Sequence, residues 1–209
     1  MDILWLKRNI KASWRHRGSL FAFFARLLFL YSHRLPKLVR RSEWVIAFHY
    51  PDPIGGLRLL LRTNKGADGF IHGEVFEHNY YHFVLPCAPK TILDLGANIG
   101  MTAIYFHRSF PNAELACVEP MPANLRILRK NLQLNTVKAT IISGAVHPAD
   151  GRLLMEVAGK DYGHRVVKHS ETVGEQYIEV PAVSIPTLLG ILRWDRIGLL
   201  KIDIEGHRS

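Results

Sequence analysis

The sequence predicts an α/β fold built around a parallel β-sheet. Short apolar segments that are typical of strands alternate with segments of helical spacing between residues 91 and 146. A glycine-containing turn directly follows the first of these strands, and residues 197–204 form an almost continuous apolar run, as in a strand buried on both faces. Alternation of this kind is typical of βαβ units joined by right-handed crossovers.

The expected elements follow one another in a regular order. In the second helix Leu125, Leu128 and Leu132 recur on one stripe, as a period of 3.6 residues requires. Two earlier strands are separated by a turn rich in proline and glycine. The expected strands are 44–49, 57–62, 91–94, 113–119, 139–146, 151–157, 177–183 and 197–204, and the expected helices are 99–109, 123–134 and 186–192, with partial helix in 73–85.

The turn after the strand at 91–94 is the most informative stretch of the chain. Asp94 ends the strand, and Gly96, Asn98 and Gly100 follow within six positions. Glycine is needed where the backbone takes an unusual φ or approaches another group closely. The free N–H groups at the start of the next helix can bind a polar ligand, and an acid at such a strand end usually meets a ligand.

A second acid, Glu119, ends the next predicted strand. In nucleoside-binding α/β sheets an acid about 20 residues after the glycine turn accepts hydrogen bonds from ribose hydroxyls. The middle glycine of the dinucleotide pattern G-x-G-x-x-G is missing, because Gly96 and Gly100 are four residues apart. The spacing therefore favours an adenosine ligand other than NAD, and an NAD-dependent oxidoreductase is the less favoured alternative.

Four sequence blocks stand out, and they are Asp94–Gly100, Val118–Asn124, Asn131–Asn135 and Leu199–Gly206. In their order and at their spacing they resemble the FkbM-type S-adenosylmethionine-dependent methyltransferases. The resemblance extends from about residue 44 to residue 206. It implies the doubly wound, mostly parallel, Rossmann-like sheet of class I methyltransferases. It also implies methyl transfer from S-adenosyl-L-methionine to a hydroxyl, often on a saccharide or polyketide.

The same resemblance implies a set of cofactor-binding residues. The turn would hold the methionine end of the cofactor, Glu119 would bind the ribose diol, and Ala145 and Val146 would pack on the adenine ring. For the last two, ordinary strand core is an equal alternative. The full set is Asp94, Gly96, Ala97, Asn98, Gly100, Glu119, Ala145 and Val146.

Asp203 and Glu205 are the candidate catalytic residues. The last strand should lie beside the first, so that its end faces the cofactor. One carboxylate could act as general base toward a hydroxyl, or both could hold a divalent metal. Alternatively they only hydrogen-bond the substrate or cap the next helix, and Lys201 could pair with either acid. His78 and His82 have helical spacing, but a solvated or substrate-facing helix is favoured over a metal site there.

The net charge of +9 lies entirely in the N-terminal segment. Residues 1–41 hold ten Lys and Arg against Asp2, and the remainder holds seventeen of each sign. The apolar run 20–31 is shorter than the roughly 20 residues of a membrane-spanning helix. The segment is therefore either a basic anchor on an anionic membrane or a helical extension packed on the domain. No specific nucleic-acid binding is expected.

The sequence predicts a helical extension over residues 1–43 and an α/β domain over 44–209. Cys87 and Cys117 make no disulfide framework, which favours a reducing compartment such as the cytoplasm or the inner face of its membrane. The sequence stops three residues after Gly206, where the family continues with further strands. An incomplete sheet is therefore expected, and an inactive relative acting as a membrane-surface or interaction module is the alternative to a methyltransferase.

Overall fold

The computed structural model describes residues 45–50, 56–63, 67–156 and 177–204. Contacts divide the chain into two compact units, Met1–Gly73 and Glu74–Ser209, and each is described by itself. The predicted extension over residues 1–43, with its expected membrane contact, lies outside the described residues. Within the described ranges, no helix has the length and apolar character needed to cross a bilayer.

The first unit contains a β-hairpin and a short helix. β1 (Val45–Tyr50) and β2 (Leu57–Arg62) pair antiparallel, which confirms the two strands expected there. Helix α3 (Ala67–His72) follows. The Arg62 guanidinium binds the Asp68 carboxylate through Nε–Oδ2 at 3.0 Å and Nη2–Oδ1 at 2.9 Å, and both side chains are buried. This bidentate pair fixes the start of α3 against the end of β2.

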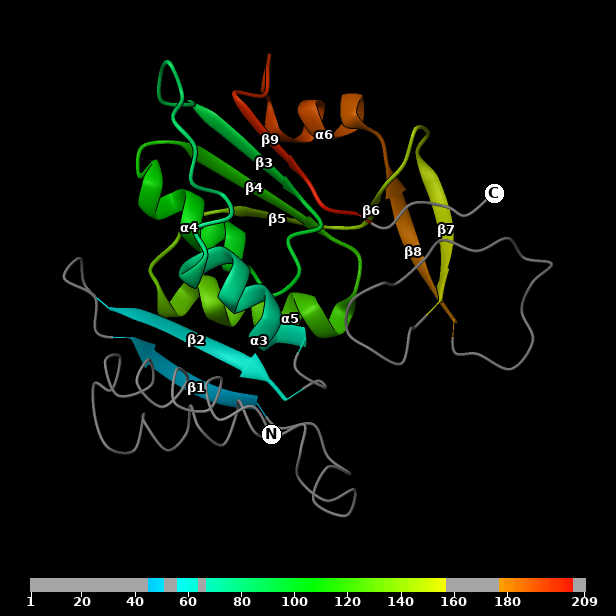
Figure 1. Cartoon of the computed structure of the whole chain (residues 1–209). Coiled ribbons are helices and arrows are strands. Elements are labelled where there is room, and N and C mark those ends of the chain that lie inside the picture. The colour runs from blue at the N-terminus through cyan, green and yellow to red at the C-terminus, as the bar shows by residue number, and fades with distance from the viewer. Residues whose placement is uncertain (1–44, 51–55, 64–66, 157–176, 205–209) are drawn as a thin grey trace. The chain divides into compact units, whose positions relative to one another are not determined.

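The four-stranded sheet of the second unit is entirely parallel, with order β5-β4-β3-β9 (Figure 1). From β3 the chain moves outward to β4 and β5, and it later returns to the other side of β3 as β9. The strand order therefore reverses between β3 and β9, and in open α/β sheets ligands bind outside the strand ends at such a point. The elements are β3 (Thr91–Leu95), α4 (Met101–Ser109), β4 (Glu114–Glu119), α5 (Pro122–Leu134), β5 (Thr140–Ser143) and β9 (Leu199–Ile202).

A second sheet of three strands corrects one expectation. The strand expected at 139–146 is two strands, because Gly144 separates β5 from β6 (Ala145–Val146). A Cβ at Gly144 would lie 3.0 Å from the carbonyl oxygen of Pro181, so the chain crosses there onto β8. An apolar pattern does not show such a change of sheet. The order is β6-β8-β7, with β7 (Gly151–Glu156) and β8 (Tyr177–Val183) antiparallel.

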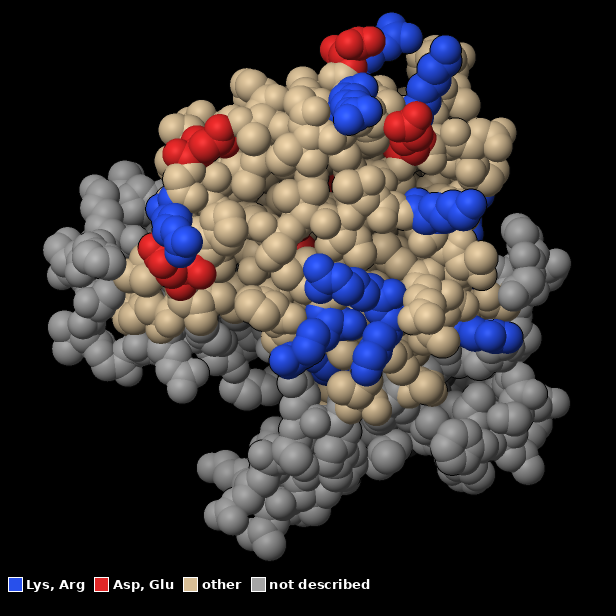
Figure 2. All heavy atoms as spheres, turned by 180° about the vertical axis from the view of Figure 1, so that it is seen from behind, with Lys and Arg blue, Asp and Glu red and all other residues tan. Residues whose placement is uncertain are grey.

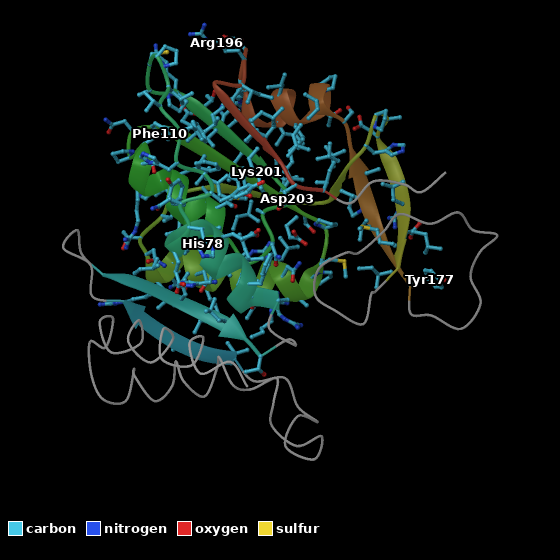
Figure 3. All side chains as sticks on the ribbon, viewed as in Figure 1. His78, Phe110, Tyr177, Arg196, Lys201 and Asp203 are labelled. Carbon is cyan, nitrogen blue, oxygen red and sulfur yellow. The ribbon has the colours of Figure 1, made fainter. Side chains whose placement is uncertain are left out.

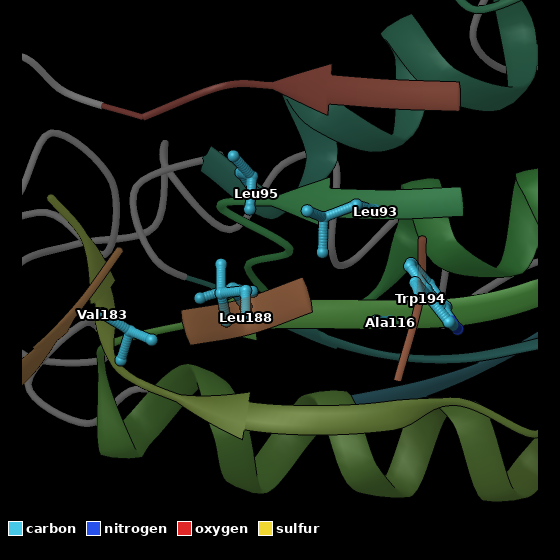
Figure 4. Close-up of a cluster of buried hydrophobic side chains, with 7 residues drawn as sticks. Leu93, Leu95, Ala116, Val183, Leu188 and Trp194 are labelled. Carbon is cyan, nitrogen blue, oxygen red and sulfur yellow. The ribbon is translucent and has the colours of Figure 1, made fainter. Parts of the chain in front are cut away.

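The two faces of β3 carry different side chains, because residues alternate along a strand. Leu93 and Leu95 join a buried cluster with Leu188 of α6 (Ile185–Leu192) and Trp194, shown in Figure 4. The indole of Trp194 also donates to Glu114 Oε2 at 2.8 Å. On the opposite face of β3, Asp94 points toward α4. Asp94 thus places an ionisable group on the face of β3 that α4 covers, where Ile92 is also buried.

The apolar run at 197–204 does not form a central strand in the described part of the chain. Of the described strands, only β3 pairs with β9. Leu200, Ile202 and Ile204 are 41%, 61% and 44% exposed. An apolar run indicates burial but cannot show how many strands border it. The expectation that β9 lies beside β3 is confirmed.

Candidate active site

The turn that joins β3 to α4, residues 96–100 and hereafter the bend, is fastened to the end of β4. The N–H groups of Gly96 and Ala97 both donate to the carbonyl oxygen of Val118, at 3.0 and 3.1 Å. The N–H of Gly100 donates to the carbonyl oxygen of Ala97 at 2.8 Å. Gly96, Asn98 and Gly100 have φ of +75°, +49° and +89°. The bend is therefore a left-handed turn whose N–H groups are largely used within the protein.

Glu119 provides the strongest link between β4 and the bend. Its carboxylate accepts from the N–H of Asn98 through Oε2 at 2.9 Å. Oε1 accepts from the N–H of Met121 and from Nδ2 of Asn124, each at 3.0 Å. The residue is 4% exposed. The structure thus brings Glu119 to the bend, as the sequence predicts, while its contact with a ribose stays a prediction.

The two glycines of the bend serve the packing of the protein on itself. At Gly96 an added Cβ would overlap the main-chain carbonyl oxygen of Asp203, which follows β9. At Gly100 it would lie 2.8 Å from Cδ1 of Leu128 in α5. Both glycines also have positive φ, which disfavours any other residue. The bend can therefore fit between β9 and α5 only with glycine at both positions.

The carboxyl ends of β3 and β9 bring three charged groups together, and Figure 3 shows Lys201 beside Asp203. Nζ of Lys201 lies 3.0 Å from Oδ1 of Asp94 and 3.7 Å from Oδ2 of Asp203. The Asp94 side chain is fully buried, whereas that of Asp203 is 75% exposed. The prediction that Lys201 pairs with an acid at this strand end is confirmed for Asp203, but its closer partner is Asp94. Glu205 lies outside the described residues.

Aromatic side chains pack beside these charges. Tyr81 contacts Phe106 of α4 with ring centroids 5.7 Å apart and Tyr105 with centroids 6.5 Å apart. Burial, and then the negative charges of Asp203, Asp94 and Glu74, raise the pKa of Tyr81 to about 12. The phenol therefore lies within electrostatic range of the acids at the strand ends. The sequence shows an aromatic-rich segment here but gives no sign that it reaches the site.

Two asparagines of α5 hold the site together and were missed by sequence reasoning. Asn124 donates to Glu119, and Asn131 donates from Nδ2 to the carbonyl oxygen of Ile99 at 2.9 Å. Both are buried. They lie seven residues apart among the leucines of the apolar stripe of this helix. A polar residue repeated on an apolar helix face is the signal that could have found them.

Ala145 and Val146 lie in the protein core. Ala145 is buried with Met155 and Val180, and Val146 packs against the cluster that contains Leu93. Both belong to β6 rather than to the end of β5, which removes the strand-end placement on which their adenine contact was predicted. That contact itself stays a prediction.

The part of the chain that the structure describes holds no group of three His, Cys, Asp or Glu that could bind a metal. His78 and His82 are exposed and follow the π-helical turn η3 (Gly73–Glu77), so the expected helix in 73–85 ends early. The paired metal ligands predicted at Asp203 and Glu205 stay a prediction, because Glu205 is not described.

The surface charge is uneven. Basic side chains gather near the lower centre of the face in Figure 2, and most of the acidic side chains on this face lie outside that group. On α5 the residues Arg126, Arg129 and Lys130 are exposed, and the helix contains no acid. The acids at the carboxyl ends of β3 and β4 are, in contrast, buried.

A parallel α/β sheet with a glycine bend after β3, an acid at the end of β4 and charged groups at the end of β9 defines a Rossmann-like class of protein. Comparison with known families gives the particular one. Residues 94–207 match the sequence model of the methyltransferase FkbM domain. Because the match covers more than half of the chain, the chain belongs to this family.

The individual relatives share about a third of their aligned residues or fewer with this chain. Methyltransferase sdnD of Sordaria araneosa is 32% identical over an alignment of 169 positions, and the alignment covers 66% of this chain and 64% of that protein. The 31-O-demethyl-FK506 methyltransferase FkbM of Streptomyces tacrolimicus is 27% identical over an alignment of 175 positions, which covers 68% of this chain and 66% of that protein. The chain thus spans just under two thirds of the length of these relatives. The crystal structure of methyltransferase FkbM from Methylobacillus flagellatus KT superposes with a TM-score of 0.43 and a sequence identity of 14%. The superposition covers 98% of this chain and 43% of that chain.

Proposed function

We propose that the protein binds S-adenosyl-L-methionine at the bend and transfers its methyl group to a hydroxyl oxygen of a small acceptor. Membership of a methyltransferase family supports this activity. The single observation that carries it is the meeting of the ends of β3, β4 and β9 where the strand order reverses. Asp94, Glu119 and Asp203 come from those three ends, and this is where open α/β sheets bind nucleosides.

The charges at this point favour a cationic nucleoside over NAD. A dinucleotide needs free N–H donors for its pyrophosphate at the glycine turn. Here the N–H groups of Gly96, Ala97, Asn98 and Gly100 donate to protein oxygens. S-adenosylmethionine instead carries a sulfonium and an ammonium group, which the exposed carboxylate of Asp203 would attract. The residues present therefore fit this cofactor.

When bound, S-adenosylmethionine supplies an electrophilic methyl group and becomes S-adenosylhomocysteine. The new bond joins that carbon to the acceptor oxygen, the carbon–sulfur bond breaks, and the hydroxyl proton must leave. Asp203 is the exposed carboxylate at this strand end, so it is the group that would accept the proton. A divalent metal held by Asp203 and Glu205 is the alternative way to activate the hydroxyl.

The acceptor is proposed by class only. The name of the Streptomyces tacrolimicus relative describes methylation at an oxygen, which supports an oxygen acceptor here. A saccharide or related metabolite is the proposed class. We also propose a cytoplasmic location, which the two unpaired cysteines support. If residues 1–41 bind lipid, the protein would lie at the inner face of the membrane.

Isothermal titration calorimetry with S-adenosylmethionine, S-adenosylhomocysteine and NAD tests the cofactor. We expect both homologous nucleosides to bind, and Glu119→Gln to weaken both by about tenfold through loss of the ionic acceptor at the bend. Glu114→Gln is the matched control, because Glu114 begins the same strand and bonds Trp194 instead. Tight binding of NAD alone would support an oxidoreductase. If none of the three compounds binds, the alternative is supported, in which the protein is an inactive relative that acts as a membrane-surface or interaction module.

A further inference from the structure

Lys201 places its ammonium group in the protein interior, on one face of β9. Its neighbours on β9, Leu200 and Ile202, are 41% and 61% exposed, whereas Lys201 is 7% exposed. The residue therefore turns its side chain to the opposite face, where Asp94 is its direct partner in the parallel register. A buried ammonium is stable only when it is paired and hydrogen-bonded.

The partners of this ammonium explain what it does. Nζ lies 3.0 Å from Asp94 Oδ1 and donates to the carbonyl oxygen of Gly96 at 2.8 Å. A longer contact of 3.4 Å reaches the carbonyl oxygen of Leu95. An ammonium has three protons, and these acceptors lie on the last residues of β3 and the first of the bend. Lys201 thus joins β9 to the start of the bend across more than a hundred residues of sequence.

Asp94 has no oxygen directed at solvent. Oδ1 faces Lys201, and Oδ2 accepts a hydrogen bond from the hydroxyl of Thr102 in α4. The side chain is fully buried. Asp94 therefore compensates the charge of Lys201, and both of its oxygens face groups of the protein. Direct contact of this acid with the ligand, which the sequence predicts, stays a prediction.

The carbonyl of Gly96 is the point at which this pair acts on the bend. Gly96 has φ +75° and lies against the main chain of Asp203, while the N–H of Asp203 donates to the carbonyl oxygen of Leu95 at 3.1 Å. Without Lys201, the carbonyl of Gly96 would lose a charge-assisted hydrogen bond at the first residue of the bend. We propose that Lys201 is a positioning residue that fixes the cofactor-binding bend through Gly96, with Asp94 acting through Lys201 rather than on the ligand. The proposal rests on the proposed function for the identity of that ligand.

The test separates positioning from stability with three variants of the full chain. Lys201→Met leaves Asp94 buried without a counter-charge, and Asp94→Asn combined with Lys201→Met removes both charges. Asp94→Asn alone keeps the ammonium on Gly96. Lys130→Met, at an exposed lysine of α5, is the matched control. Stability is measured by urea unfolding, and binding by calorimetry with S-adenosylhomocysteine and with 5′-methylthioadenosine, which lacks the amino-acid group.

We expect the double variant to be more stable than Lys201→Met but still to bind both nucleosides about tenfold more weakly than the wild type, because Gly96 is no longer held. Asp94→Asn should change the affinities for the two nucleosides by the same factor. Recovery of binding together with stability in the double variant would show that Lys201 is only structural. A loss in Asp94→Asn confined to S-adenosylhomocysteine would show that Asp94 contacts the amino-acid group, and either result overturns the proposal.

Hydrogen exchange of the ligand-free protein keeps this test independent of the cofactor. We expect the peptide covering residues 94–100 to exchange about tenfold faster in the double variant, while the β8 peptide and the Lys130→Met control stay unchanged. Unchanged exchange at 94–100 would overturn the role of Lys201. If the wild type binds neither nucleoside, the proposed function fails, and this exchange still decides whether Lys201 positions the bend.

Discussion

The N–H of Asn98 donates to Oε2 of Glu119 at 2.9 Å, which ties the bend after β3 to the last residue of β4. Glu119 in turn accepts from Asn124 of α5. One buried carboxylate thus joins a turn, a strand and a helix. The bend is therefore shaped before any ligand arrives, and its geometry depends on side chains that come from other elements.

Replacing Glu119 by glutamine is expected to lower the free energy of unfolding by about 2 kcal/mol, because an amide offers one acceptor oxygen and turns its NH₂ toward buried donors. Urea unfolding followed by circular dichroism measures the change. Glu114→Gln, at the other end of β4, should cost less than about 1 kcal/mol, since Glu114 is exposed and its side chain accepts a hydrogen bond from the indole of Trp194. Equal losses in the two variants would contradict the role given to Glu119.

Gly96→Ala is expected to destabilise the protein by about 3 kcal/mol, because the new methyl group meets the main chain of Asp203 and φ is +75°. Gly190→Ala provides the opposite control. Nothing lies within 4 Å of an added Cβ at Gly190, which is in α6, so alanine should stabilise by about 0.5–1 kcal/mol. The urea-unfolding midpoints of the two variants should therefore move in opposite directions. A Gly96→Ala protein of wild-type stability would refute the close contact between Gly96 and the main chain of Asp203.

Tyr81 is expected to be the tyrosine whose ionisation is delayed. Burial and nearby acids raise its pKa to about 12 from the usual 10. The neutral phenol is the favoured form, so the stability it contributes is present below pH 10 and is lost as the pH rises toward 12. A spectrophotometric titration of phenolate should show a late step that Tyr81→Phe removes. Tyr80 is the neighbouring tyrosine and is 72% exposed, so Tyr80→Phe should leave the late step in place. If Tyr80→Phe removed the late step, the step would belong to Tyr80 and not to Tyr81.

Only one of the two cysteines should react with an aromatic disulfide reagent in the folded protein. Cys87 is exposed and Cys117 is buried in β4. Burial, with a further contribution from Asp94 that Lys201 opposes, raises the pKa of the Cys117 thiol well above its usual value. Thiolate is the reactive form, so Cys117 should react only after unfolding. Cys87→Ser should abolish the fast reaction, and a fast reaction that persists would mean that β4 opens locally.

The elements that could be predicted are those with a local pattern. The strand expected at 177–183 has the same bounds in the structure, and the hairpin strands and the α5 helix differ by a residue at most. Hydrophobic periodicity depends only on neighbouring residues, so it appears in the sequence directly. Glu119 could also be placed near the bend, because adjacent parallel strands end at the same edge of a sheet.

Other features depend on residues that are distant in the sequence. The break at Gly144 arises from contact with Pro181 and Val183 of another sheet. The sequence shows Asn131 as one polar residue on an apolar helix, but only the fold gives it the carbonyl of Ile99 as a partner. Tyr81 likewise reaches the acids only because its segment packs on α4.

The sequence by itself determined the class of fold, the glycine turn after the first core strand and the acids near the ends of three strands, because these depend on residue type and short-range order. Only the tertiary structure decided how those acids differ. Asp94, inside β3, is buried against Lys201, whereas Asp203, directly after β9, faces solvent, although both lie near the ends of apolar strands. The charge that compensates a buried carboxylate comes from a strand more than a hundred residues away, and only the pairing of β3 with β9 brings the two together.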